Sequence, residues 1–464
     1  MRSLAKAIFP GGSGLKGLIP PFSRNWAALS AACVLLLVGS GCGGWWRSPS
    51  PSTNGAGSGD AKPDGSSFAE ADTSTNIILS LEERVKHDPE DFIAFNKLAG
   101  YYLQRLRETG DLKYLELTTR AAHASLGILP AENNVGALSA LAQAEFAAHD
   151  FGAARDHALQ LVEMEPRKSY PYQILADALL ELGDYTEDAL AFRRMRESGG
   201  GIGGETRLAR FDTLRGQTDN VRRRFEGALA SALEEVPRPR ETVAWCHWQL
   251  GELSLSAGDY EDAERRYREA LAALPDYHRA VAGLARALAA RGDLLSATAE
   301  AERAVRILPE LSSVALLGDL YNAAGRKREA DAQYALVEQI ARLSALNGAL
   351  YNRQLALFYA DHDVKAEEAY RLASKEYEVR RDIYGADTLA WTALKAGKIS
   401  EAQTAIKEAL RLGTRDARLF YHAGMIARAA GDESAARDYL RRALELSPQF
   451  DLVQAPLARK ALEG

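Results

Sequence analysis

The sequence contains only three cysteines among its 464 residues. So few cysteines exclude a disulfide scaffold and a four-cysteine zinc site. The sequence also lacks an excess of positive charge, because its 57 Lys and Arg residues are outnumbered by 63 Asp and Glu residues. The first 41 residues hold four basic residues and no acidic one, so the net charge of −6 becomes −10 for the rest of the chain. This acidic body argues against binding to DNA or RNA, which needs a basic surface.

The sequence also lacks the short motifs that mark common active sites. It has no G-x-x-x-x-G-K-[ST], H-E-x-x-H, C-x-x-C or G-x-S-x-G. Gly199–Gly204 matches G-x-G-x-x-G, but a helix is expected before it instead of a strand, so we interpret it as a turn linker. Asp361, His362 and Asp363 could coordinate a cation, but they occupy an expected turn and are interpreted as solvated. We therefore predict no catalytic residue, no metal site, no cofactor and no enzymatic activity.

The N-terminus has the three parts of an export signal. Four basic residues precede an uncharged run at Trp26–Val38, and small residues follow at positions 39–41. This order predicts a signal peptide over residues 1–41. The end of the segment, V-G-S-G-C, resembles the lipobox of bacterial lipoproteins. The resemblance implies a lipid attached to Cys42 and a location in the cell envelope, facing the periplasm or the exterior. Gly43 implies the outer membrane if the organism has two membranes.

An uncleaved membrane anchor is the alternative interpretation of this segment. The 22 residues between Arg24 and Arg47 carry no charge, and about 20 residues are enough to span a bilayer. Trp45 and Trp46 would then lie at the membrane interface. The glycine-rich stretch at 39–44 disfavours one continuous helix. Both interpretations tether the body of the protein to a membrane, outside the cytoplasm.

Residues 42–76 are predicted to form a flexible linker. From Arg47 onward this segment consists largely of Ser, Pro, Gly, Asp and Thr. Such a composition buries too little apolar surface to offset the entropy of ordering, so we expect a disordered N-terminal tether.

The rest of the chain repeats one pattern of residues every 34 positions. Within each copy the apolar residues recur three and four positions apart, which predicts one face of a helix. Gly-Asp pairs predict a turn in the middle of the copy, and a proline predicts its end. Three copies are Leu250, Gly251, Gly258, Tyr260, Ala263, Tyr267, Ala270 and Pro275; Leu284, Ala285, Gly292, Leu294, Ala297, Ala301, Ala304 and Pro309; and Ala423, Gly424, Gly431, Ala436, Leu440, Ala443 and Pro448.

This pattern resembles the tetratricopeptide repeat, a helix–turn–helix unit of 34 residues with small residues at positions 8 and 20. The resemblance implies an all-α solenoid of stacked antiparallel helix pairs. We predict repeats over residues 77–198 and 202–448, separated by a flexible break at Gly199–Gly204, and a capping helix over 449–464. The repeats are expected to start near Phe92, Val135, Ser169, Ile202, Ala244, His278, Leu311, Ala349, Ile383 and Ala417.

The same resemblance indicates where a partner would bind. In stacked repeats of this family, positions 2, 5, 9 and 12 of each first helix line a concave groove that holds peptides. Here many of these positions hold Trp, Tyr or Arg, the residue types that dominate binding hot spots. A register shift of one residue would bury Trp248, and Trp391 could instead pack beneath the segment near Gly348. The predicted partner-binding residues are Trp245, Trp248, Glu252, Arg279, Arg286, Arg353, Trp391, Arg418 and Tyr421.

These observations favour a non-enzymatic, membrane-tethered scaffold that binds a peptide or protein partner in its groove during assembly of a cell-envelope complex. Two alternatives remain at this point. The protein could be a structural spacer that associates with itself, or it could be an accessory subunit of an envelope enzyme.

Overall fold

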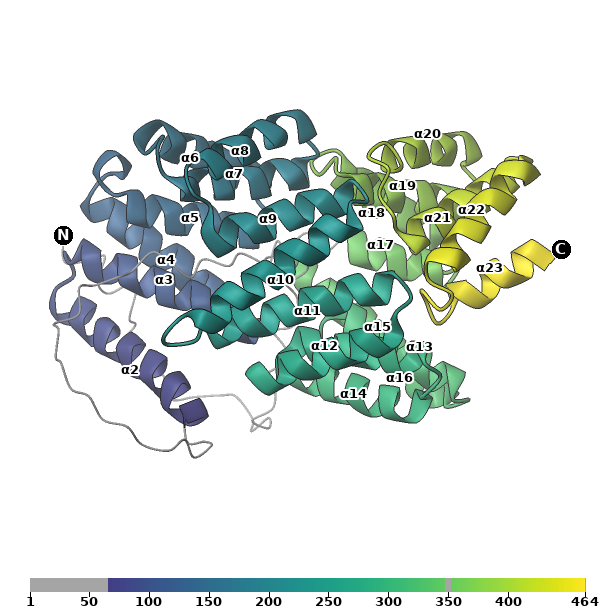
Figure 1. Cartoon of the computed structure of the whole chain (residues 1–464), viewed down its shortest axis with the longest axis horizontal. Coiled ribbons are helices and arrows are strands. Elements are labelled where there is room, and N and C mark those ends of the chain that lie inside the picture. Colours follow the sequence, from purple (N-terminus) through teal and green to yellow (C-terminus); the bar gives the residue numbers. More distant parts are fainter. Residues whose placement is uncertain (1–65, 347–351, 464) are drawn as a thin grey trace, which may run out of the picture.

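The computed structural model describes residues 66–346 and 352–463. Within these ranges the chain forms α-helices and one short 3-10 helix, with no β-strand. Figure 1 shows the helices packed side by side in antiparallel pairs. The all-α prediction is therefore confirmed. The predicted signal peptide, Cys42 and the Gly348 segment lie outside the described residues.

The helices follow one another with short connections. They are α2 (Ser66–His87), α3 (Phe92–Thr109), α4 (Lys113–Ile128), η1 (Ala131–Asn133), α5 (Val135–Ala147), α6 (Phe151–Met164), α7 (Ser169–Leu182), α8 (Tyr185–Glu197), α9 (Gly201–Leu214), α10 (Thr218–Glu234), α11 (Arg240–Ser256), α12 (Tyr260–Ala273), α13 (His278–Ala290), α14 (Leu294–Ile307), α15 (Leu311–Ala323), α16 (Lys327–Leu346), α17 (Asn352–Asp361), α18 (Ala366–Tyr377), α19 (Ile383–Lys395), α20 (Ile399–Ala409), α21 (Ala417–Ala429), α22 (Glu433–Leu446) and α23 (Gln454–Glu463). None of these helices is both long enough and apolar enough to cross a bilayer.

Of the ten repeat starts predicted from the 34-residue spacing, Ile202 and Ala244 lie inside α9 and α11, and Ala349 lies outside the described residues. The other seven coincide with the first residue of a helix: Phe92, Val135, Ser169, His278, Leu311, Ile383 and Ala417. Two expectations need correction. Helix α2 begins at Ser66 instead of inside the predicted repeats, so residues 66–76 extend it into the predicted linker. Gly201 starts α9, and the amide of Gln173 on α7 donates to the carbonyl of Gly200, so the stack continues through the expected break.

Each helix pair is held together where a small residue faces a bulky one. Gly251, at position 8 of its repeat, lies against the ring of Tyr267 so closely that a Cβ would stand 2.6 Å from it. Gly283, on the next first helix, approaches the same ring from the other side. Gly424 makes the equivalent close contact with Leu440. A larger residue at these positions would force the helices apart, which explains the pattern of small and bulky residues.

The Gly-Asp pairs form the turns that connect the two helices of a repeat. Gly258, Gly292 and Gly431 have φ angles between 77° and 85°, a left-handed conformation that glycine adopts without a steric cost. The aspartate that follows each of them accepts a hydrogen bond from a backbone N–H in the first turn of the second helix. This capping satisfies a donor that the helix itself leaves unpaired.

The chain does not remain an open array, because helix pairs far apart in sequence touch each other. The hydroxyl of Tyr185 accepts a hydrogen bond from the backbone N–H of Ile383, 198 residues away. The hydroxyl of Tyr260 lies 3.0 Å from that of Ser447, 187 residues away. Thr414 donates to the carbonyl of Leu214, 200 residues away. The turn inside one helix pair therefore contacts the end of the pair five repeats further on.

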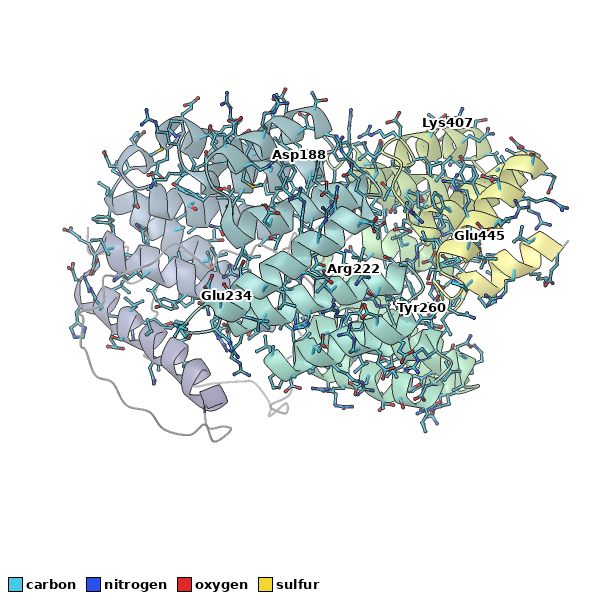
Figure 2. All side chains as sticks on the ribbon, in the orientation of Figure 1. Asp188, Arg222, Glu234, Tyr260, Lys407 and Glu445 are labelled. Atoms are coloured by element: carbon cyan, nitrogen blue, oxygen red, sulfur yellow. The ribbon has the colours of Figure 1, made fainter. Side chains whose placement is uncertain are left out.

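These contacts join successive turns of a superhelix, and we call them the seam. Figure 1 shows α7 and α8 beside α18 and α19 in the upper part of the molecule. Tyr260 is labelled in Figure 2 where the α11–α12 turn meets the yellow C-terminal helices. In a simple solenoid each repeat contacts only its neighbours. Here the seam adds a second set of neighbours, which buries residues that an open array would expose.

The last helix, α23, packs against the end of the stack. Ala458 on α23 is fully buried against α21 and α22, in a cluster with Phe420 and Leu440. The guanidinium of Arg428 donates to the carbonyl of Ala461, which fixes the end of α23. Helix α23 thus takes the place of the first helix of another repeat and covers the apolar face of the last complete pair.

Candidate partner-binding surface

Two arginines among the predicted partner-binding residues, Arg286 on α13 and Arg418 on α21, keep accessible side chains. Arg286 on α13 forms an ion pair with Glu252 on α11 at 2.5 Å, yet its side chain is 41% exposed. The hydroxyl of Tyr267 donates to the same carboxylate at 2.7 Å. Burial lowers the pKa of Arg286, but Glu252 and Tyr267 together outweigh it, so the pKa is raised overall; Arg418 is near enough to oppose this increase.

Arg418 on α21 is the second of these arginines, and its side chain is 40% exposed. It pairs with Asp451 at 2.6 Å and lies 4.0 Å from Asp361 at the end of α17. Asp361 also accepts hydrogen bonds from the indole of Trp391 and the amide of Gln454. Sequence reasoning interpreted Asp361 as a solvated turn residue. The structure instead makes it a half-buried acceptor that connects α17 to α19 and α23.

Trp391 and Tyr421 lie inside the stack, so the structure corrects their expected place in an open groove. Trp391 is only 1% exposed. Its ring stacks on His422 at a centroid distance of 4.3 Å and lies 5.5 Å from the ring of Tyr421. Tyr421 in turn packs against Phe450. Phe450 and the last helix belong to the same apolar cluster as Trp391 and Tyr421, so the C-terminal residues help to cover both rings.

The two tryptophans of α11 differ from each other. Trp245 is buried and packs edge-on against Phe225 at 5.6 Å. Trp248 is half-buried, and the guanidinium of Arg279 lies over its ring at 5.2 Å. Arg279 itself is buried. The structure therefore corrects the groove placement of Trp245 and Arg279, and it leaves the exposed edge of Trp248 near the inner face.

Arg353 belongs to a buried network of charges and not to an accessible surface. It pairs with Asp382 at 2.5 Å and with Glu376 at 3.1 Å. Arg380 joins these carboxylates to Glu181 on α7 across the seam. Burial raises the pKa of Glu181, but Arg380 and Arg210 lower it below its ordinary value overall. We call this network the paired junction; its members are Glu181, Arg210, Arg353, Glu376, Arg380 and Asp382.

The nine predicted residues thus divide into two groups. Five of them are buried: Trp245, Arg279, Arg353, Trp391 and Tyr421. The other four, which we call the accessible inner residues, are Trp248, Glu252, Arg286 and Arg418. A role of these residues in partner binding stays a prediction. The position of a residue within its repeat does not predict whether it is buried or accessible, because contacts across the seam cover some of these positions and not others.

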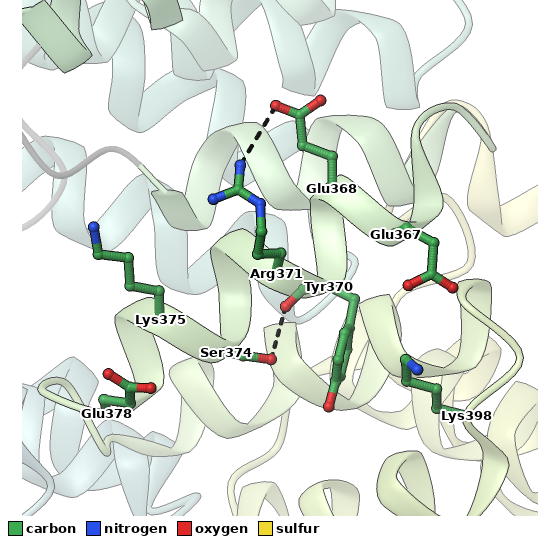
Figure 3. A pocket seen from close by; sticks show the side chains of 8 residues that line it. All are labelled: Glu367, Glu368, Tyr370, Arg371, Ser374, Lys375, Glu378 and Lys398. Atoms are coloured by element: carbon green, nitrogen blue, oxygen red, sulfur yellow. Dashed lines mark hydrogen bonds and ion pairs between the residues drawn. The ribbon is translucent and has the colours of Figure 1, made fainter.

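The surface hollows of the described residues do not coincide with the predicted partner-binding residues. One, of about 810 Å³, lies along α18 and the residue before α20, and Figure 3 shows the charged side chains that line it. Within it Arg371 faces Glu368 at 3.8 Å, and the hydroxyl of Ser374 donates to the carbonyl of Tyr370. None of the predicted partner-binding residues lines this hollow. In the described part of the chain, no three His, Cys, Asp or Glu residues are arranged to hold a metal ion.

Comparison with known families agrees with this geometry. Models of the tetratricopeptide repeat match residues 139–201, 254–315 and 388–449. These three segments are therefore tetratricopeptide repeats. No curated protein matches the chain. The human IFIT1 dimer with PPP-AAAA shares 15% identity over 82% of this chain and 88% of that one, with a TM-score of 0.43. A tetratricopeptide repeat protein from Parabacteroides merdae shares 16% identity over 57% of this chain and 98% of that one, with a TM-score of 0.33.

Proposed function

We propose that this tetratricopeptide repeat protein is a non-enzymatic scaffold that binds a peptide or protein partner on the inner face of its superhelix. The proposal includes a lipid anchor at Cys42 and a role in assembling a cell-envelope complex. The observation that carries it is the proximity of Arg286 on α13 and Arg418 on α21, each about 40% exposed. Arginine and tryptophan are enriched in binding hot spots, and the half-buried Trp248 lies on α11, the helix that also carries Glu252, the partner of Arg286.

A peptide that reaches this surface would meet both signs of charge. Arg286 and Arg418 can each give one face of a guanidinium to a carboxylate or a carbonyl, while Glu252 and Asp451 keep the arginines oriented. Because these pairs are already formed, little side-chain entropy is lost when a partner binds. This arrangement favours an extended segment with acidic or carbonyl groups at two points.

Site-specific photocrosslinking in the full-length, membrane-tethered protein tests the proposal. A photoreactive residue placed at Ala289, one turn beyond Arg286 on α13, should give a discrete crosslinked product in cells. The double substitution Arg286→Ala and Arg418→Ala should remove that product. The control places the same photoreactive residue at Arg371, which lines the charged hollow on α18. Equal crosslinking from both positions, or a product that survives the double substitution, would contradict the proposal.

The anchor is tested separately. Cys42→Ala should release the protein from the membrane fraction if a lipid on this cysteine holds it there. A protein that stays in the membrane after this substitution would favour the uncleaved anchor.

A further inference from the structure

At one part of the seam the charged side chains make only long contacts with one another, whereas the paired junction contains ion pairs of 3.1 Å or less. This part, which we call the unpaired junction, consists of Arg107, Glu241, His278, Arg279 and Glu310. It lies where the α3–α4 turn meets the start of α13: a Cβ on Gly110 would stand 3.4 Å from the imidazole of His278. His278 is 2% exposed and Arg279 is 6% exposed, so the cluster is mostly shielded from water.

The members of this junction lie near one another without forming hydrogen bonds. The Nε of Arg107 is 4.0 Å from a carboxylate oxygen of Glu241, and Nε2 of His278 is 3.6 Å from Oε1 of Glu310. Both distances exceed those of protein hydrogen bonds. Five buried polar atoms find no hydrogen-bond partner: Nε of Arg107, Nε of Arg279, both ring nitrogens of His278 and Oε1 of Glu310. Buried polar groups of folded proteins are nearly always hydrogen-bonded, so such a cluster points to a bound group.

The unpaired atoms are mainly donors, and positive charge is in excess. Both arginines stay charged. Burial and the neighbouring Arg279 lower the pKa of His278 to about 3, so its imidazole is neutral and donates one N–H. Burial raises the pKa of Glu310 to about 7, although Arg279 opposes this, so its negative charge is only partly present at neutral pH. The pKa of Glu241 is raised in the same way, against the effect of Arg107 and Arg279.

Three helix N-termini reinforce this positive character. Glu241 lies in the first turn of α11, His278 and Arg279 begin α13, and Glu310 precedes α15. In none of these three helices does the N-cap side chain accept a hydrogen bond from the helix, whereas Asn134, Asp382 and Asp416 cap α5, α19 and α21. Free backbone N–H groups and the helix dipole both favour an anion.

We propose that the unpaired junction binds a small oxyanion, a carboxylate or phosphate group held between Arg107 on α3 and Arg279 on α13. The anion would accept hydrogen bonds from Nε of both arginines and from the imidazole of His278, which supplies the acceptor atoms that this junction lacks. Because Arg107 and Arg279 belong to different turns of the superhelix, the bound anion would hold the first turn against the second. This site is separate from the proposed partner-binding surface, which uses Arg286 and Arg418.

Calorimetric titration of the full chain with sodium phosphate and, separately, sodium acetate tests this proposal. Sodium chloride keeps the ionic strength constant. We expect saturable binding at one site. Arg279→Gln should weaken binding at least tenfold. Arg224→Gln is the matched control, because Arg224 on α10 is partly buried, lies outside both proposed sites and already pairs with the carboxylates of Glu205 and Asp212; its affinity should stay within twofold. Tighter binding of phosphate would identify a phosphate ligand, and tighter binding of acetate a carboxylate.

Three results would overturn the proposal: no saturable heat with either anion, equal binding of chloride, or equal losses in Arg279→Gln and Arg224→Gln. If Arg279→Gln fails to fold by circular dichroism, Arg107→Gln replaces it with the same expected loss. A second readout is the side-chain Nε–H resonances of the arginines in the wild-type protein. Phosphate or acetate should shift those of Arg107 and Arg279 and leave that of Arg224 in place. Failure of partner crosslinking from Ala289 would not affect any of these results.

Discussion

The paired and unpaired junctions occupy equivalent places in the superhelix but treat charge in opposite ways. At the paired junction the α7–α8 turn meets the start of α19, six helix pairs further on, and at the unpaired junction the α3–α4 turn meets the start of α13, five helix pairs further on. At the paired junction Glu181 has two arginine partners and Arg353 has two carboxylate partners. At the unpaired junction Arg279 has no ion pair within 4.0 Å among the described residues. The same geometry can thus serve as a fixed internal contact or as a place for a ligand.

The two junctions should also differ in how much the free energy of unfolding changes when one of their arginines is removed. A buried ion pair costs desolvation energy that its partners must offset, so breaking one leaves an uncompensated charge. An unpaired buried arginine already bears that cost, so its removal should be nearly neutral. The predictions below use this contrast, and they begin with the largest expected effect.

Arg380→Met should lower the free energy of unfolding by about 3–5 kcal/mol, because it removes one of the two arginines that neutralise the buried Glu181. Urea unfolding followed by circular dichroism measures this loss. Arg371→Met is the control, since the side chain of Arg371 is largely exposed and its ion pair is long; it should change stability by less than about 0.5 kcal/mol. Similar losses in both variants would show that the paired junction does not hold the turns together.

Gly183→Ala should cost about 3 kcal/mol, whereas Gly292→Ala should cost about 1 kcal/mol. Both glycines have left-handed backbones, with φ of 78° and 85°. A Cβ on Gly183 would collide with the backbone carbonyl of Arg381 across the seam, whereas a Cβ on Gly292 would meet nothing within 4 Å. The difference between the two unfolding free energies isolates the seam contact from the backbone effect. Equal costs would mean that the seam opens freely at this point.

Asp188→Ala should stabilise the protein by about 1–3 kcal/mol at neutral pH. Asp188 occupies position 20 of its repeat, where Ala154, Ala263 and Ala297 stand elsewhere, and neither carboxylate oxygen has a partner. Burial and the neighbouring Asp177 raise its pKa from the ordinary 3.8 to about 9. The folded chain therefore holds a proton that the unfolded chain releases, so stability should fall as pH rises from about 4 to 9. The unfolding midpoint should therefore change less with pH in the variant than in the wild type. An equal pH dependence in both proteins would contradict the raised pKa of Asp188.

Arg279→Met should change the free energy of unfolding by less than about 1 kcal/mol in anion-free buffer, because this buried arginine has no ion pair to lose. Addition of phosphate should stabilise the wild type and leave the variant unchanged, since a ligand stabilises only the form that binds it. Thermal unfolding with and without phosphate measures both quantities. A loss as large as that of Arg380→Met would remove the distinction between the two junctions.

The sequence was sufficient to predict the local architecture. The spacing of Gly251, Tyr267 and Ala263 indicated which faces meet within a pair, and the Gly-Asp turns indicated where helices end, because these features depend on residues close together in the chain. Position 20 also made Asp188 visible as an exception, although its meaning became clear only with its burial.

The seam could not be predicted in the same way. It depends on the small rotation between successive helix pairs, which accumulates over five repeats and leaves no residue motif. As a result the exposure of Arg353 and Trp391 was misjudged, while Arg286 and Arg418 were placed near the inner face. Glu181 and Arg380 lie 199 residues apart, and nothing in their local sequence indicates that they meet.

The contact of Tyr260 with Ser447 limits how such a chain can change its length during evolution. A linear array can gain or lose one unit anywhere by gene duplication or deletion, because the remaining units still fit their neighbours. Here an added unit between α12 and α22 would move every later turn by one place and set Tyr260 opposite the wrong loop. Growth should therefore be tolerated at the ends of the chain, whereas changes between these two residues would have to occur in compensating steps.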